Sequence, residues 1–137
     1  MSTKRSRVAL VTGASSGIGK ATATALVSAG YVTYATARRV EVLSALEDLG
    51  CRVLQLDVTN DASMVAAVRA VETEHGAISV LVNNAGYGEM GPLEELDMVD
   101  VRREFETNVF GLLRMCQLVL PGMRQQGYGR IVNIGSI

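Results

Sequence analysis

The stretch Val8-Ala-Leu-Val-Thr-Gly-Ala-Ser-Ser-Gly-Ile-Gly19 decides the fold of this chain. Its apolar start, Val8–Val11, predicts a buried strand. Gly13, Gly17 and Gly19 follow in a short turn, and a helical pattern begins directly after them. A strand, a glycine turn and a helix bring backbone N–H groups and a helix N-terminus to one point, where a phosphate can bind. We therefore expect a nucleotide site here, with a glycine-rich turn that binds nothing as the alternative.

The spacing of the glycines limits which nucleotide motif this is. It reads Gly-x-x-x-Gly-x-Gly, whereas the usual dinucleotide fingerprint is Gly-x-Gly-x-x-Gly. A P-loop is excluded because Lys20 is followed by Ala21 and not by Ser or Thr. Ser15 and Ser16 add hydroxyl donors within the turn.

Length, composition and charge place the chain among ordinary globular proteins. Its 137 residues suit one domain, 1–137, with 48% apolar and 20% charged residues. A formal net charge of −1 predicts neither a nucleic-acid nor a membrane partner. Without an apolar signal core or a run of about 20 apolar residues, we expect a cytoplasmic protein. Cys51 and Cys116 are expected to be free thiols, and no Cys/His cluster predicts a metal site.

Strand and helix patterns alternate along the whole chain. Strands are predicted at residues 8–11, 31–37, 52–56, 78–82 and 130–134, and helices at 18–29, 40–49, 62–74 and 100–126. Such alternation predicts an α/β fold, a Rossmann-type, doubly wound parallel sheet with helices on both faces. Because such a sheet normally continues past a fifth strand, we expect the C-terminal part of the fold to be missing.

Two finer expectations concern the helices. The first helix is expected to carry Ile18, Ala21, Ala25 and Leu26 along one face. The last one carries a broad apolar stripe from Phe105 to Met123, and Pro121 inside it predicts a kink or an early end.

The end of the second strand indicates which dinucleotide would bind. An NAD site usually has an acidic residue there, which accepts hydrogen bonds from the ribose hydroxyls. Here Arg38 and Arg39 follow Ala37, and no carboxylate comes before Glu41. Because Arg suits bidentate phosphate contact, the pattern favours NADP over NAD. The alternative is a solvated basic pair that opens a helix.

Polar residues follow the other strands at the same edge of the predicted sheet. Asp57 and Val58 end the third strand, where the carboxylate could hold an adenine or cap the next turn. The fourth strand ends in Asn83-Asn84-Ala85-Gly86, a polar turn that could also leave room for a flat ligand. Asn108 lies on the apolar stripe of the long helix and needs a partner. Ser136 follows the fifth strand and is either a site residue or a simple turn residue.

Together these motifs resemble the short-chain dehydrogenase/reductase family, and within it the branch of hydroxysteroid and retinol dehydrogenases. The resemblance covers the whole chain and implies hydride exchange between a nicotinamide and a carbonyl or alcohol carbon. It implies two catalytic residues, Asn108, which holds a water of the proton relay, and Ser136, which orients the substrate oxygen. The residues that it implies at the cofactor are Gly13, Ser15, Ser16, Gly17, Ile18, Gly19, Arg38, Arg39, Asp57, Val58, Asn84, Ala85 and Gly86.

One part of the family's pattern is absent from these residues. The family's catalytic Tyr-x-x-x-Lys pair lies beyond the serine, and no lysine follows Lys20 in this sequence. We expect the chain as given to be an inactive fragment of an NADP-dependent oxidoreductase. The resemblance further implies an apolar alcohol or ketone as substrate and a homo-oligomer for the complete enzyme. The alternative is a non-catalytic NADP-binding or interaction module.

Overall fold

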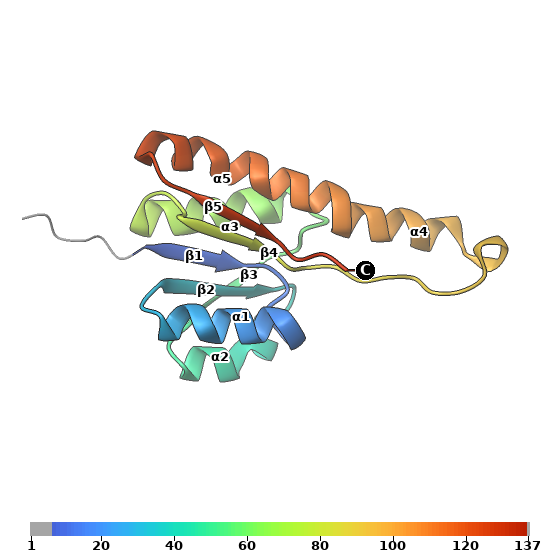
Figure 1. The fold of residues 1–137 in the computed structure, drawn as a ribbon, viewed down its shortest axis with the longest axis horizontal. Coiled ribbons are helices and arrows are strands. Elements are labelled where there is room, and N and C mark those ends of the chain that lie inside the picture. Colours follow the sequence, from blue (N-terminus) through green and yellow to red (C-terminus); the bar gives the residue numbers. More distant parts are fainter. Residues whose placement is uncertain (1–6, 137) are drawn as a thin grey trace, which may run out of the picture.

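The computed structural model describes residues 7–136, which form a five-stranded parallel sheet (Figure 1). The strand order is β3-β2-β1-β4-β5, with every neighbouring pair parallel. The predicted fold class is confirmed. The strands are β1 (Val8–Val11), β2 (Val32–Ala37), β3 (Arg52–Gln55), β4 (Val80–Asn83) and β5 (Arg130–Asn133).

The strand order changes direction on either side of β1. The chain runs outward from β1 to β2 and β3, then returns to place β4 on the other side of β1. In parallel α/β sheets, ligands bind at such a switch point, outside the carboxyl ends of the strands. The topology therefore puts the glycine turn after β1 at the expected position for a ligand.

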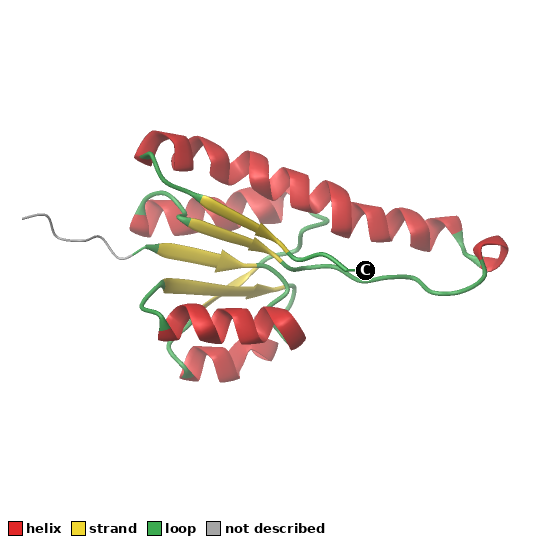
Figure 2. Ribbon diagram, in the orientation of Figure 1, coloured by secondary structure: helices red, strands yellow, loops and turns green. Residues whose placement is uncertain are grey.

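Helices cover both faces of the sheet (Figures 1 and 2). The short helix α2 follows a 3₁₀ turn at Val40–Leu43, and a π turn at Glu106–Gly111 joins α4 to α5. One face carries α1 and α2, whereas the other carries α3 and α5. The α-helices are α1 (Gly17–Ser28), α2 (Ser44–Asp48), α3 (Asp61–His75), α4 (Met98–Phe105) and α5 (Leu112–Gln126).

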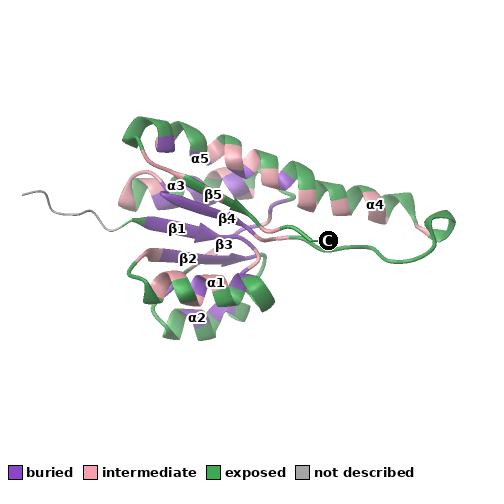
Figure 3. Cartoon of the chain, in the orientation of Figure 1, coloured by how far each residue is buried: buried purple, intermediate pink, exposed green. Residues whose placement is uncertain are grey.

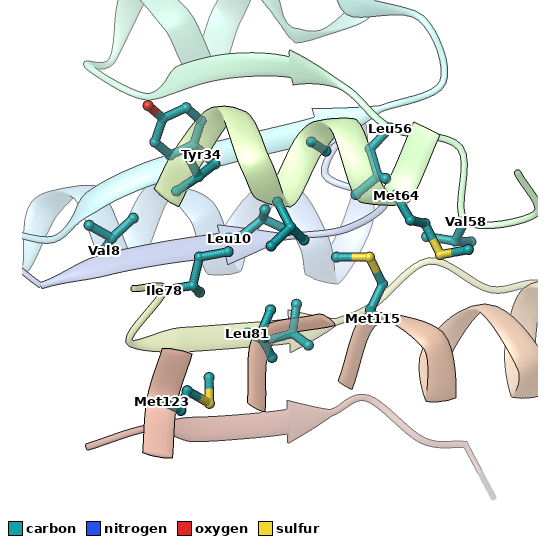
Figure 4. Close-up of a cluster of buried hydrophobic side chains, with 14 residues drawn as sticks. Val8, Leu10, Tyr34, Leu56, Val58, Met64, Ile78, Leu81, Met115 and Met123 are labelled. Atoms are coloured by element: carbon teal, nitrogen blue, oxygen red, sulfur yellow. The ribbon is translucent and has the colours of Figure 1, made fainter. Parts of the chain in front are cut away.

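Strand β1 packs in both layers, which explains its continuous apolar run. Val8 and Leu10 join the core beneath α3 and α5 (Figure 4), whereas Ala9 and Val11 join the core beneath α1 and α2. All four residues of β1 are buried (Figure 3), because successive side chains of a strand point to opposite faces and helices cover both faces of this sheet.

The predicted apolar face of α1 is confirmed at Leu26, which packs against the core beneath α1 and α2, and is wrong at the other three residues. Gly19 and Ala23 are the buried residues of this helix, while Ile18 is 60% exposed. The reason is the close approach at Gly19, where a side chain would overlap the carbonyl oxygen of Gly13. This contact turns the helix so that Ala21 and Ala25 face solvent.

The early helix end that Pro121 predicts does not occur, because α5 continues to Gln126. Pro121 is exposed, so the carbonyl group that it leaves unpaired can bond to water. The helix instead ends at Gly127, which has the left-handed φ of 74°.

The apolar stripe of the long helix is only partly buried. Met115, Val119 and Met123 face the core, while Phe105 and Leu113 are exposed.

Cys51 and Cys116 are free thiols, as predicted. Within residues 7–136, no helix is long and apolar enough to cross a membrane.

Candidate functional site

A cavity of about 490 Å³ opens at the carboxyl ends of the strands, between the turn after β1 and the loops after β2, β3 and β4. Most of the predicted cofactor residues line it, although Gly17, Gly19 and Arg39 do not. The lining residues are Gly13, Ser15, Ser16, Ile18, Ala37, Arg38, Leu56, Asp57, Val58, Thr59, Asn84, Ala85, Gly86, Tyr87 and Thr107.

The glycines of the turn are required for two different reasons. Gly13 and Gly17 have φ values of 60° and 56°, a left-handed region that disfavours side chains. Gly13 also lies so close to the next loop that a Cβ would be 2.8 Å from the Cα of Ala85. Gly19 is needed for contact alone, because it lets α1 pack against the turn. The turn thus exposes backbone at the cavity wall.

The N-terminus of α1 suits an anion. Ser16 is its N-cap residue, but no side chain caps the helix. The first turn contains no acidic residue. The free N–H groups and the positive end of the helix dipole therefore face the cavity without a competing carboxylate.

Arg38 is one of the residues that line this cavity. Together with Ser15 it also lines an adjoining hollow of about 450 Å³, and Arg39 lines only that hollow. Within residues 7–136, neither arginine belongs to an ion pair. Arg38 is thus an uncompensated cation next to the helix N-terminus.

Thr12 and Asn84 tie the ends of β1 and β4 together. The Thr12 Oγ1 atom accepts hydrogen bonds from the backbone N–H groups of Asn84 (3.0 Å) and Ala85 (2.9 Å). Asn84 Nδ2 donates to the carbonyl oxygen of Gly13 over 2.8 Å. Asn84 is therefore more than a residue of a simple polar turn, because its side chain links the loop after β4 to the turn after β1.

Asn108 lies in the π turn and is held against the loop after β4. Its Oδ1 accepts from the N–H of Tyr87 (3.1 Å), and its Nδ2 donates to the carbonyl oxygen of Tyr87 (2.6 Å). A Cβ on Gly86 would lie 2.8 Å from the Asn108 Oδ1 atom, so a larger residue there would displace the Asn108 carboxamide. The predicted need for a partner is confirmed, and both groups of the carboxamide bind one residue of the cavity wall.

Ser136 follows β5 at the same edge of the sheet, and its residue is exposed. Neither Ser136 nor Asn108 lines the cavity itself, but Asn108 is hydrogen-bonded to Tyr87, which does. Several lining residues were missed by sequence analysis. Thr59, Tyr87 and Thr107 each adjoin a predicted site residue in the sequence, but only tertiary contacts turn them toward the cavity.

The chain belongs to the short-chain dehydrogenase family, whose sequence pattern matches residues 7–137. The similar curated proteins include 3-ketodihydrosphingosine reductase from Bacteroides thetaiotaomicron, which is 43% identical over 96% of this chain and 47% of its own length. Human retinol dehydrogenase 8 is 35% identical over 96% of this chain and 44% of its own length. An NADP-dependent 3-hydroxy acid dehydrogenase from Salmonella typhi is 41% identical over 94% of this chain and 54% of its own length.

Solved structures agree with this assignment. A short-chain dehydrogenase from Streptomyces avermitilis superposes with a TM-score of 0.94 at 41% identity, over 98% of this chain and 50% of that one. A metagenomic short-chain oxidoreductase in complex with NADP gives a TM-score of 0.89 at 34% identity, over 96% of this chain and 62% of that one. The chain thus spans about half the length of the curated relatives that it matches.

Proposed function

We propose that this chain is the cofactor-binding part of an NADP-dependent oxidoreductase that exchanges hydride between a nicotinamide and a carbonyl or alcohol carbon. One observation carries the proposal. A single cavity is lined by the uncapped N-terminus of α1, by Arg38, which has no ion-pair partner among residues 7–136, and by Tyr87, which is hydrogen-bonded to Asn108. The NADP-dependent relative and the NADP complex of a similar structure support this choice of cofactor.

The residues present fit NADP along the length of the cavity. The glycine turn and the N-terminus of α1 would hold the pyrophosphate, because both offer backbone N–H groups. Arg38 would hold the 2′-phosphate, with Arg39 further away in the adjoining hollow. Asp57 and Val58 line the part of the cavity left for the adenine. When bound, the cofactor supplies or accepts the hydride.

The proton that accompanies the hydride needs residues outside this stretch. No Tyr-x-x-x-Lys occurs among residues 1–137. We infer that Asn108 and Ser136 contribute to a site that a longer chain completes, and that residues 1–137 alone are inactive. The names of two relatives, a 3-ketodihydrosphingosine reductase and a retinol dehydrogenase, favour an apolar alcohol or ketone as substrate.

The cofactor assignment is tested by titrating the complete protein with NADPH and NADH. We expect NADPH to bind more tightly by about tenfold or more, because a charged hydrogen bond to the 2′-phosphate is lost in NADH. Arg38→Asp should reverse this order. Arg69→Asp is the matched control, since Arg69 is exposed on α3 and does not line the cavity. Equal affinities in the parent protein would contradict the role of Arg38.

The same protein distinguishes an enzyme from a binding module. An oxidoreductase should consume NADPH when an apolar ketone is added, which is followed by the loss of nicotinamide absorbance. A non-catalytic module would bind NADPH and leave it unchanged with every ketone and alcohol tried.

A further inference from the structure

The loop that follows β4 is the part of the cavity wall that the backbone holds least. Gly86 and Tyr87 line the cavity, and residues 84–92 contain no helix or strand. Within residues 7–136, none of the backbone–backbone hydrogen bonds involves residues 86–91. These six residues are also exposed, so burial does not fix them either. The position of this stretch therefore depends on side chains of other elements.

Two side chains of one helical stretch supply the attachment. Asn108, in the π turn, binds both the N–H and the carbonyl group of Tyr87. One turn earlier, in α4, the Glu104 Oε2 atom accepts a hydrogen bond from the N–H of Glu89 over 3.2 Å. The spacings match, because two residues of extended chain span up to about 6.6 Å and one helical turn rises about 5.4 Å. The loop therefore runs along the helix and is bound to it at two successive points (Figure 1).

The Glu104 carboxylate has no second partner that competes for it. Within residues 7–136 it belongs to no ion pair, and the hydrogen bond from Glu89 is the one described for its side chain. Its other oxygen, Oε1, lies 4.0 Å from the position of a Cβ on Gly88, so the carboxylate lies against the loop backbone. A hydrogen bond from an N–H group to a carboxylate is stronger than one between neutral groups. Glu104 therefore serves to hold residues 88 and 89.

The stretch that Glu104 holds offers apolar surface beside the cavity. Tyr87 lines the cavity and is 39% exposed, while Met90, next to Glu89, is 94% exposed. A wall that has one arrangement before a ligand arrives costs less free energy to order on binding. We propose that Glu104 is a positioning residue, which fixes this loop so that its apolar surface is ready to receive a ketone. This inference rests on the proposed oxidoreductase function and gives a role to a residue outside the predicted site.

Amide hydrogen exchange of the complete protein tests the attachment. Glu104→Ala removes the acceptor, and the Glu89 amide should then exchange about tenfold faster than in the parent. Glu104→Gln keeps an oxygen that can accept the same hydrogen bond, so exchange should stay within about threefold of the parent. Glu106→Ala is the matched control and should change nothing. Glu106 is exposed in the adjoining π turn, and its side chain makes none of the hydrogen bonds or ion pairs described within residues 7–136.

Kinetics separate positioning from a merely structural role. NADPH consumption by the complete protein is followed with butanone, octan-2-one and decan-2-one, and the variants are compared on the ketone that the parent reduces fastest. Glu104→Ala should raise the KM for this ketone by about fivefold or more, because part of the population has a loosened wall. The Kd for NADPH should stay within about twofold, since Arg38 and the glycine turn lie on other loops. Glu104→Gln should restore the KM.

The outcomes distinguish the inference from the function on which it rests. Equal exchange of the Glu89 amide in the parent and in Glu104→Ala would overturn the inference. An equal loss of affinity for the ketone and for NADPH in Glu104→Ala would also overturn it, because that result indicates a general disturbance of the site. A parent protein that binds NADPH but reduces none of the ketones would instead overturn the proposed function, whatever the exchange at Glu89.

Discussion

Thr12 joins three backbone groups at the carboxyl end of β1. Besides accepting from Asn84 and Ala85, its hydroxyl donates to the carbonyl oxygen of Val82 over 3.4 Å. Thr12 is 2% exposed, so water cannot replace these bonds. A single buried hydroxyl therefore sets the distance between two loops of the cavity wall.

Thr12→Val should test this arrangement. The valine would fit the space but leave the two N–H groups without their acceptor, which should lower the free energy of unfolding by about 2–4 kcal/mol. Denaturation by urea measures the change. Thr33→Val is the matched control, because Thr33 is also buried in the sheet but its hydroxyl makes one hydrogen bond, to the Tyr31 carbonyl oxygen. Equal losses in both variants would show that the network adds nothing.

The residues of the site were predictable to different degrees. The glycines and arginines of the site could be predicted from local chemistry, since a tight turn needs backbone freedom and a phosphate needs a cation. The partner of Asn108 was not predictable, because Tyr87 lies 21 residues away in the sequence. Thr59 gives no signal either, as a threonine after a strand is ordinary in a turn.

Strand β3 and the last turn of α3 are joined by ionised groups. Arg52 pairs with Glu74, and the Tyr34 hydroxyl donates to Glu74 over 3.1 Å. The hydrogen bond from Arg52, followed by that from Tyr34, lowers the pKa of Glu74. Burial, followed by the hydrogen bond to Glu74, raises the pKa of Tyr34. This cluster attaches the end of α3 to the edge of the sheet.

The lowered pKa of Glu74 predicts how stability changes with pH. A carboxyl group with a lower pKa in the folded state stabilises the protein above its unfolded pKa, and this contribution is lost as the pH falls through the folded pKa. Glu74→Gln should therefore be less stable than the parent at pH 7, and the difference should shrink toward about pH 3. Urea denaturation at both pH values measures it.

Glu94→Gln is the control for this comparison, because Glu94 is an exposed residue of the 3₁₀ turn Leu93–Glu95. It should show little difference from the parent at either pH. A stability difference for Glu74→Gln that is the same at both pH values would exclude the ion pair as its cause.

The elements themselves were largely predictable, because strands buried on both faces read as apolar runs and glycines end the helices. The predictions that failed concern features that contacts between elements determine. The face of α1 follows from the approach at Gly19, and the π turn at Glu106–Gly111 brings Asn108 to the loop after β4. Neither contact has a local periodic signal.

At the scale of the whole molecule, the sheet is buried at its centre and open at its two edges. Strands β1, β2 and β4 are mostly buried, whereas no residue of the edge strands β3 and β5 is buried, and β5 is largely exposed (Figure 3). Figure 1 shows α4 and the loop before it extending beyond the carboxyl edge of the sheet. Apolar side chains of this loop, of α4, of the π turn, of α5 and of β5 remain in contact with solvent. The large exposed ones are Tyr87, Met90, Leu93, Met98, Val99, Phe105, Val109, Phe110, Leu113, Leu120 and Val132.

Exposed apolar groups of this kind promote association, because burying them removes apolar surface from water. Residues 1–137 expressed alone should therefore self-associate as their concentration rises, which sedimentation velocity measures. Phe105→Glu together with Leu113→Glu should shift the distribution toward monomer, since each of these side chains is at least half exposed and its replacement will not disturb the core. Leu49→Glu is the control, because Leu49 is 56% exposed at the end of α2 on the other face. If the parent sediments as a monomer at every concentration, or if Leu49→Glu is equally effective, the α4–α5 side is not the surface that associates.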